Sequence, residues 1–202
     1  MKKVLSLGLA LCLALMLAAC GSSKESAQSA LESALTAVKN MDTAAMETYF
    51  GEDVLNDNGE DVNAGANAVD DNQKLLLKNL TFKVTSCQES DGKAEAVVDI
   101  TNVDMAQVLS DFMQQAISET LSYAFLPEDE QPSDEELQKK FSDLLASLLD
   151  ADDLEMVTNT VNLSMTYADS QWKIAPTNEL VDALLGGAVS SLESLGMMST
   201  PE

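Results

Sequence analysis

The chain has 202 residues, with 34 acidic residues against 11 basic ones, no histidine and a formal net charge of −23. All 11 basic residues are lysines, so the chain also lacks arginine. This balance argues against nucleic-acid binding, which needs a basic surface, and against adhesion of the protein surface to anionic lipid headgroups.

The first 19 residues have the pattern of an export signal. Lys2 and Lys3 precede an apolar run over residues 4–16, and small residues lead to Cys20. The segment 17–21, LAACG, resembles the lipobox of bacterial lipoproteins. That resemblance implies a signal peptide over 1–19, cleavage before Cys20 and attachment of palmitate-type acyl chains at Cys20. The mature protein is then expected on the extracytoplasmic face of the cell membrane, held by its lipid.

Two alternatives to the lipobox reading are an ordinary secretory signal with an incidental cysteine and a short membrane anchor. The anchor is disfavoured because a spanning helix needs about 20 apolar residues, more than this run provides. Residues 20–26 are then a lipidated cysteine with a flexible polar tether. Without Lys2 and Lys3, 9 lysines remain against 34 acidic residues, a net charge of −25 that favours a soluble monomer.

The first part of the mature chain is predicted to be helical. Residues 27–39 place small and apolar side chains on one helical stripe. Asp42 is the expected N-cap of a second short helix that ends at Gly51. Residues 51–73 are rich in Asn, Asp and Gly and are predicted to form a surface loop, with room for one short helical turn.

Two strand pairs are predicted further along, separated by helices. Residues 75–87 and 94–101 alternate apolar and polar side chains around an Asp-Gly turn, which predicts a hairpin. Residues 104–126 and 133–149 show helical periodicity, with Ser133 and Glu136 forming a capping box. The remaining expectations are a second hairpin over 157–175, a last helix from Asn178 interrupted at 186–187, and a disordered tail over 196–202.

This order predicts one α+β domain over 27–195, with helices packed on a curved antiparallel sheet of about four strands. The opening SALTAVKNMDTAAMETYF and the ending VNLSMTYADSQWKIAPTNELVDALLGG resemble the first helices and final hairpin of NTF2-like domains. The departure from that family is the helical pair at 104–149, which would be an insertion. The NTF2-like fold hosts unrelated functions, so the resemblance names no activity.

Catalytic chemistry has few candidates in this composition. Without histidine, Cys87 lacks a base and is expected to be a half-buried strand residue. Asp99 and Asp104 flank a strand end and are the carboxylate pair worth testing for sugar hydrolysis, with solvated or capping roles as the simpler alternative. An NTF2-like isomerase would also need a phenol in an apolar pocket, from Tyr49, Tyr123 or Tyr167.

No cofactor and no metal site is predicted. Zinc is disfavoured by the lack of histidine. The segment 53–59, DVLNDNG, invites comparison with a calcium loop, but the template fails at both ends.

Two functions therefore remain open: a non-enzymatic binding domain on a lipid tether, or a small-substrate enzyme using carboxylates in an apolar pocket. The partner of the binding domain is expected to be a small apolar ligand or an extracytoplasmic protein. A pocket inside the sheet would be lined by apolar residues that point inward: Phe82, Val84, Val98, Ile100, Leu163, Met165 and Trp172. The helical pair would either fill this space or cover its rim as a lid.

Overall fold

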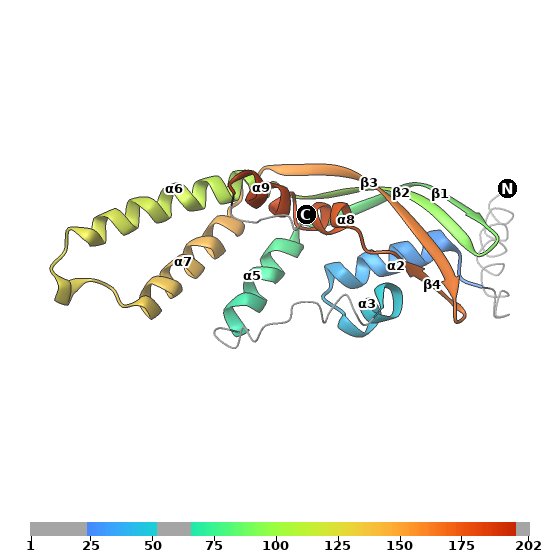
Figure 1. Cartoon of the computed structure of the whole chain (residues 1–202), viewed down its shortest axis with the longest axis horizontal. Coiled ribbons are helices and arrows are strands. Elements are labelled where there is room, and N and C mark those ends of the chain that lie inside the picture. Colours follow the sequence, from blue (N-terminus) through green and yellow to red (C-terminus); the bar gives the residue numbers. More distant parts are fainter. Residues whose placement is uncertain (1–23, 52–65, 197–202) are drawn as a thin grey trace, which may run out of the picture.

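The computed structural model describes residues 24–51 and 66–196, which form an elongated α+β molecule (Figure 1). The predicted cleavage site, Cys20, the 53–59 segment and the tail from residue 197 lie outside these residues. The α+β class and the four-stranded antiparallel sheet are confirmed. The described elements, in chain order, are α2 (Ala27–Lys39), α3 (Thr43–Phe50), α5 (Ala66–Lys78), β1 (Thr81–Ser90), β2 (Lys93–Val103), α6 (Met105–Ala124), η1 (Glu128–Glu130), α7 (Asp134–Leu149), β3 (Met156–Ala168), β4 (Gln171–Ile174), α8 (Asn178–Leu184) and α9 (Ala188–Ser194).

The sheet is an open meander in the order β1-β2-β3-β4. The β1–β2 hairpin closes at Ser90 opposite Lys93, around the predicted Asp-Gly turn. Strand β3 pairs with the whole of β2, from Lys93 opposite Thr166 to Val103 opposite Met156. The α2, α3, α5 and α8 helices lie on one side of this sheet (Figure 1).

The main hydrophobic core lies between that side of the sheet and the helices α2 and α8. Alternation along β2 and β3 buries one side chain in two, so Val98, Ile100 and Leu163 have no exposed surface. Alanines on α2 let the helix approach the sheet closely, and Ala27, Ala30 and Ala34 are fully buried in this core. Trp172 on β4 is fully buried in the same cluster.

The opposite side of the sheet is polar. Neighbouring side chains hydrogen-bond across the strands there: the Thr101 and Thr158 hydroxyl oxygens lie 2.7 Å apart, and the Thr160 hydroxyl donates to Asp99 at 2.7 Å. Antiparallel sheets commonly have one solvent-exposed face of this kind.

The helical pair forms an arm that extends from one end of the sheet (Figure 1). We define the arm as residues 105–149, comprising α6, η1 and α7. At its base a second hydrophobic cluster contains Val103, Met105, Val108 and Leu149, with Leu75, Leu76 and Ala188 packed against it. The pair therefore neither fills the space under the sheet nor covers its rim, which corrects both arrangements expected from the sequence.

The segment before β1 also differs from the prediction. Residues 66–78 form α5, whereas the sequence predicts the end of a loop and the start of a strand there. The apolar run Leu75–Leu77 is compatible with either structure. In the fold it divides between two clusters: Leu75 and Leu76 contact the base of the arm, and Leu77 contacts the main core. The strand begins only at Thr81.

The joint between sheet and arm depends on two residues. Asn102 is fully buried, and its side chain donates to the Leu184 carbonyl at 2.7 Å and accepts from the Val103 N–H at 2.9 Å. Gly186 has φ +61°, and its carbonyl accepts from the Met105 N–H at 3.0 Å. The predicted break at Gly186–Gly187 is confirmed, because α8 ends before it and α9 begins after it. The cap of α8 is Thr177, not Asn178.

Candidate functional site

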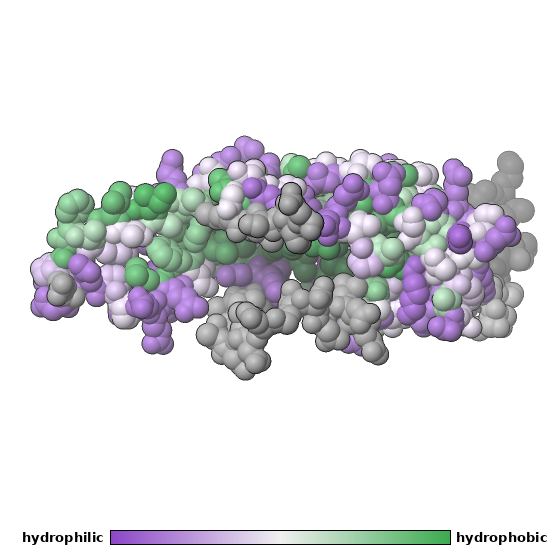
Figure 2. Space-filling model, viewed as in Figure 1, coloured by the Kyte–Doolittle hydropathy of each residue, from purple (hydrophilic) through white to green (hydrophobic). Residues whose placement is uncertain are grey.

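The most prominent candidate site is an exposed apolar stripe along the second half of α6 and the two residues after it, near the tip of the arm (Figure 2). We call the residues Ile117, Leu121, Phe125 and Leu126 the arm stripe. Their exposed fractions are 55%, 57%, 87% and 38%. Single exposed apolar residues need no explanation, but a gathered set of this kind marks interaction surfaces.

The arm stripe is exposed because α6 uses its other side to contact α7. Phe112 of α6 and Phe141 of α7 pack edge to face with ring centroids 6.1 Å apart. Lys140 of α7 lies over the Tyr123 ring at 5.2 Å from its centroid. Residues 117, 121 and 125 are spaced four apart, so they share a face that these contacts leave open.

The most exposed residues of α6 carry no charge, although one residue in six of the chain is acidic. The two acidic residues of α6, Asp111 and Glu119, are both partly buried. Asp111 accepts hydrogen bonds from Gln107 at 3.2 Å, and Glu119 accepts one from the Tyr123 hydroxyl at 3.3 Å. The exposed polar residues of α6 are all neutral, among them Ser110, Gln114, Gln115, Ser118, Thr120 and Ser122.

The tip of the arm is acidic. Asp129, Glu130, Asp134 and Glu135 are exposed there, and Asp129 and Glu130 line a groove together with Leu126 of the arm stripe. This groove, of about 560 Å³, is lined by Tyr123, Leu126, Asp129, Glu130, Gln131, Pro132, Glu136, Lys139, Lys140 and Asp143. Within this groove Lys139 is paired with Asp143 at 2.6 Å. Hydrogen bonds from the Ser133 N–H and hydroxyl hold the pKa of Glu136 below its ordinary value.

At the opposite end of the molecule, the first described residues are fastened to the sheet. The Lys24 ammonium lies 2.7 Å from the Glu89 carboxylate, next to the β1–β2 turn. It also lies over the rings of Tyr167 and Trp172, at 4.3 and 4.5 Å from their centroids. The Trp172 indole N–H donates to the Glu25 carbonyl at 2.8 Å. We call this set of contacts the Lys24 clamp.

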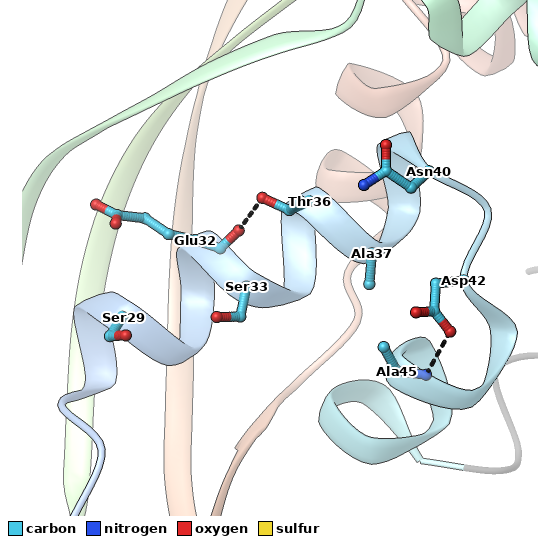
Figure 3. A pocket seen from close by; sticks show the side chains of 8 residues that line it. All are labelled: Ser29, Glu32, Ser33, Thr36, Ala37, Asn40, Asp42 and Ala45. Atoms are coloured by element: carbon cyan, nitrogen blue, oxygen red, sulfur yellow. Dashed lines mark hydrogen bonds between the residues drawn. The ribbon is translucent and has the colours of Figure 1, made fainter. Parts of the chain in front are cut away.

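A second groove, of about 340 Å³, lies on α2 and α3 (Figure 3). Its polar groups mainly serve the two helices themselves. The Thr36 hydroxyl donates to the Glu32 carbonyl at 2.7 Å, and the Asp42 carboxylate caps α3 by accepting from the Ala45 N–H at 3.1 Å. Asp42 is the cap that the sequence predicts. Apart from Asp42, which serves as the helix cap, Glu32 is the one carboxylate that lines this groove. The groove therefore presents no pair of acid–base groups.

The residues predicted to line a pocket are brought together, but as packed core. Val98, Ile100, Leu163, Met165 and Trp172 are each at most 2% exposed. Phe82 and Val84 are partly buried against the same cluster, whose other side is formed by α2 and α8. A nearby apolar pocket lined by Val38, Met46, Phe50, Pro176, Leu180, Val181 and Leu184 holds only about 70 Å³, well below the roughly 300 Å³ of ordinary ligand pockets.

The residues weighed for catalysis do not assemble. Asp99 accepts from Thr160 on the polar side of the sheet, whereas Asp104 caps α6 by accepting from the Ala106 N–H at 3.0 Å. Five residues of extended chain span about 16 Å, more than the 5–9.5 Å or so between glycosidase carboxylates. The three tyrosines lie on three elements: Tyr49 on α3, Tyr123 on α6 and Tyr167 on β3.

Cys87 lies in β1 and is partly buried, as predicted. Burial raises the pKa of its thiol, and the neighbouring Glu89 carboxylate raises it further. Both effects disfavour the nucleophilic thiolate. Among residues 24–51 and 66–196, no cluster of three potential metal ligands is found.

The sequence predicts the two helices of the arm but not the arm stripe. The missed signal is the width of the apolar surface on α6. Its apolar residues cover more than one helical face, so a single partner helix cannot bury all of them. They are Met105, Val108, Leu109, Phe112, Met113, Ala116, Ile117, Leu121 and Ala124 within the helix, followed by Phe125 and Leu126.

No protein-family model and no curated protein matches this chain. A solved structure with a similar fold is the crystal structure, at 2.62 Å, of a Bacillus subtilis subsp. subtilis str. 168 protein named "putative lipoprotein (ycdA)". The two structures superpose with a TM-score of 0.53 at 17% sequence identity. The match covers 77% of this chain and 53% of that one, so this chain spans about half the length of its neighbour.

This likeness shows that the chain shares the fold of a protein described as a lipoprotein. In the part of the chain that the structure describes, no helix has the length and apolar character needed to cross a bilayer. The resemblance to NTF2-like domains stays a prediction.

Proposed function

We propose that this protein is a non-enzymatic lipoprotein that is anchored through Cys20 and presents the arm stripe to an extracytoplasmic protein. The exposed arm stripe carries this proposal, because a soluble domain rarely leaves such an apolar set uncovered without a partner. The lipid anchor is supported by the sequence over 17–21 and by the fold shared with a protein described as a lipoprotein.

The position of the arm fits display away from a membrane. Lys24 is four residues after Cys20, so the clamp lies within about 14 Å of the proposed lipidation site along an extended chain. The clamp lies at the β1–β2 turn, and β2 runs from this turn to the base of the arm. Because β2 has 11 residues and α6 has 20, the two elements span about 36 and 30 Å.

The binding part of the proposal is tested by crosslinking in intact cells. A photoreactive phenylalanine analogue replaces Leu121 in the arm stripe, or Met156 in β3 as a matched control. Both residues are exposed and apolar, with exposed fractions of 57% and 44%. The expected result is a discrete protein adduct from position 121 and none from position 156. Adducts from both positions, or from neither, would overturn the proposal.

The anchor is tested separately with Cys20→Ala. The variant is expected to lose lipid labelling and processing at residue 20, because the thiol that receives the lipid is gone. Several acyl chains together hold a protein on a membrane where one barely does, since each buried methylene contributes about 0.8 kcal/mol. Membrane partition and electrophoretic mobility identical to those of the wild type would show that the lipoprotein assignment is wrong.

A further inference from the structure

The arm stripe has the geometry of a helix-docking surface. Between its first and last turns, α6 uses its backbone N–H and C=O groups within the helix, so a partner contacts mainly side chains. Side chains four residues apart form the ridges that pack into the grooves of a second helix. Ile117, Leu121 and Phe125 form one such ridge, about 12 Å long at the α-helical rise. An apolar helix face of two to three turns matches this length.

The charges around the arm stripe specify the polar part of that partner. The arm contains nine acidic residues and two lysines. Seven of these acidic residues belong to η1 and α7, and the other two, Asp111 and Glu119, are partly buried residues of α6. A partner helix can therefore bury its apolar stripe on α6 while its flanking side chains approach carboxylates such as Asp129 and Glu130. Flanking lysines or arginines complement this field, and flanking acids are repelled.

The same charges disfavour two other possible occupants of the arm stripe, namely a second copy of the chain and an anionic lipid surface. A second copy of the chain would bring two arms of net charge −7 together within a pair of strongly acidic proteins. An anionic lipid surface would face the acidic tip beside Phe125 and Leu126.

We propose that the arm stripe binds a cationic amphipathic helix of an extracytoplasmic protein, in which one apolar face is flanked by lysine or arginine. This inference rests on the proposed function and names the chemistry of the partner.

The test uses the full lipidated protein in nanodiscs of zwitterionic phosphatidylcholine, with empty nanodiscs as background. Two fluorescent helical peptides of about 20 residues, the length of α6, serve as probes. Both have the same leucine face, flanked by lysine in one and by glutamate in the other. Fluorescence anisotropy measures their affinities for the wild type, for Leu121→Ser/Phe125→Ser and for Met156→Ser. The serine variants retain the core, because all three positions are exposed.

The lysine peptide is expected to bind the wild type and Met156→Ser equally. Its affinity for the double variant is expected to fall at least about tenfold, which corresponds to about 1.4 kcal/mol, because two apolar contacts at the centre of the interface are lost. The glutamate peptide is expected not to bind. If the double variant bound the lysine peptide with unchanged affinity, the binding would come from general attraction to an acidic protein. That result would overturn the proposal. Equal binding of the two peptides, or no binding of the lysine peptide, would also overturn it.

Sedimentation of the same samples tests whether a second copy of the chain binds to the arm stripe. A dimer that dissociates in Leu121→Ser/Phe125→Ser would assign the arm stripe to self-association and overturn the inference. The proposed function is judged independently: an adduct at position 121 in cells, together with failure of the lysine peptide, would retain the binding role and reject only the cationic helix.

Discussion

Position 186 requires a glycine, both because of the space around it and because of its backbone conformation. A Cβ atom built at this position would lie 1.8 Å from the Val103 carbonyl oxygen. Its φ of +61° is also unfavourable for residues with a side chain. The glycine thus allows the α8–α9 turn to contact the end of β2 directly, where the arm begins.

Gly186→Ala is expected to destabilise the protein by more than about 2 kcal/mol, because the left-handed conformation alone costs about 1–2 kcal/mol and the clash adds to it. Gly187→Ala is the control: its φ is +79°, but nothing lies within 4 Å of its Cβ position. Urea unfolding of both variants measures the difference. Equal losses would show that the contact with Val103 is not tight.

Trp172 links the main core to the start of the described chain. Its ring is fully buried, packs edge to face on Tyr167 with centroids 5.3 Å apart, and donates to the Glu25 carbonyl. Trp172→Ala is expected to lower the free energy of unfolding by about 3–5 kcal/mol. Because Trp172 is the sole tryptophan of the chain, its fluorescence maximum reports its burial directly. A maximum typical of hydrated indole in the folded protein would contradict this position.

At the scale of elements, α7 begins with the capping box that the sequence predicts. The Ser133 side chain accepts from the Glu136 N–H, and the Glu136 carboxylate accepts from the Ser133 N–H. Ser133→Ala is expected to cost about 1 kcal/mol and to speed hydrogen exchange in the first turn of α7. Ser147→Ala, at an exposed position of the same helix, is expected to cause no loss. The capping role would be contradicted if exchange in the first turn did not change.

The Lys24 clamp should weaken in acid. The hydrogen bond from Lys24, followed by that from the Ala27 N–H, lowers the pKa of Glu89 from its ordinary 4.5. A carboxylate with a lowered pKa stabilises the fold above its unfolded pKa, and this contribution is lost as the pH falls through the lowered value. NMR signals of residues 24–27 are therefore expected to shift below pH 4.5. Glu89→Gln should show the shifted state already at neutral pH, and wild-type signals there would refute the link.

These elements show what the sequence can and cannot predict. The helices of the arm and both hairpins follow from strong periodicity and from local signals such as the Ser133 box and the Asp-Gly turn. Helix α5 could not be predicted in this way. Leu75 and Leu76 pack against the base of the arm and Leu77 packs against the main core, so these contacts exist only once the arm and the sheet have folded.

The candidate site depends even more on tertiary structure. The sequence identifies α6 as amphipathic, but α7 and α9 determine which of its apolar residues are covered. Only the arrangement of these three helices shows that Ile117, Leu121 and Phe125 stay exposed. In the same way, the inward residues of the sheet are predictable as apolar, whereas the packing of α2 and α8 against them is not.

At the scale of the whole molecule, the clamp and the arm lie at opposite ends of the elongated body (Figure 1). If the lipid is on Cys20, the clamp keeps the β1–β2 turn close to the bilayer. The strong negative charge of the chain adds repulsion from an anionic surface, which opposes a flat orientation. The molecule is therefore expected to stand upright, with the tip of the arm farthest from the membrane.

This orientation can be measured by energy transfer to acceptor dyes in the bilayer. A donor is placed at Lys93→Cys beside the β1–β2 turn, or at Glu130→Cys at the tip, both in a Cys87→Ser background. Positions 93 and 130 are exposed, so labelling leaves the core intact. High transfer is expected from position 93 and little from position 130, because β2 and α6 together separate the two ends by tens of ångströms. Equal transfer would indicate a molecule lying flat, and the reverse order would place the arm at the membrane. Glu89→Gln should reduce the difference between the two positions, since it releases the clamp that holds the turn near the lipid.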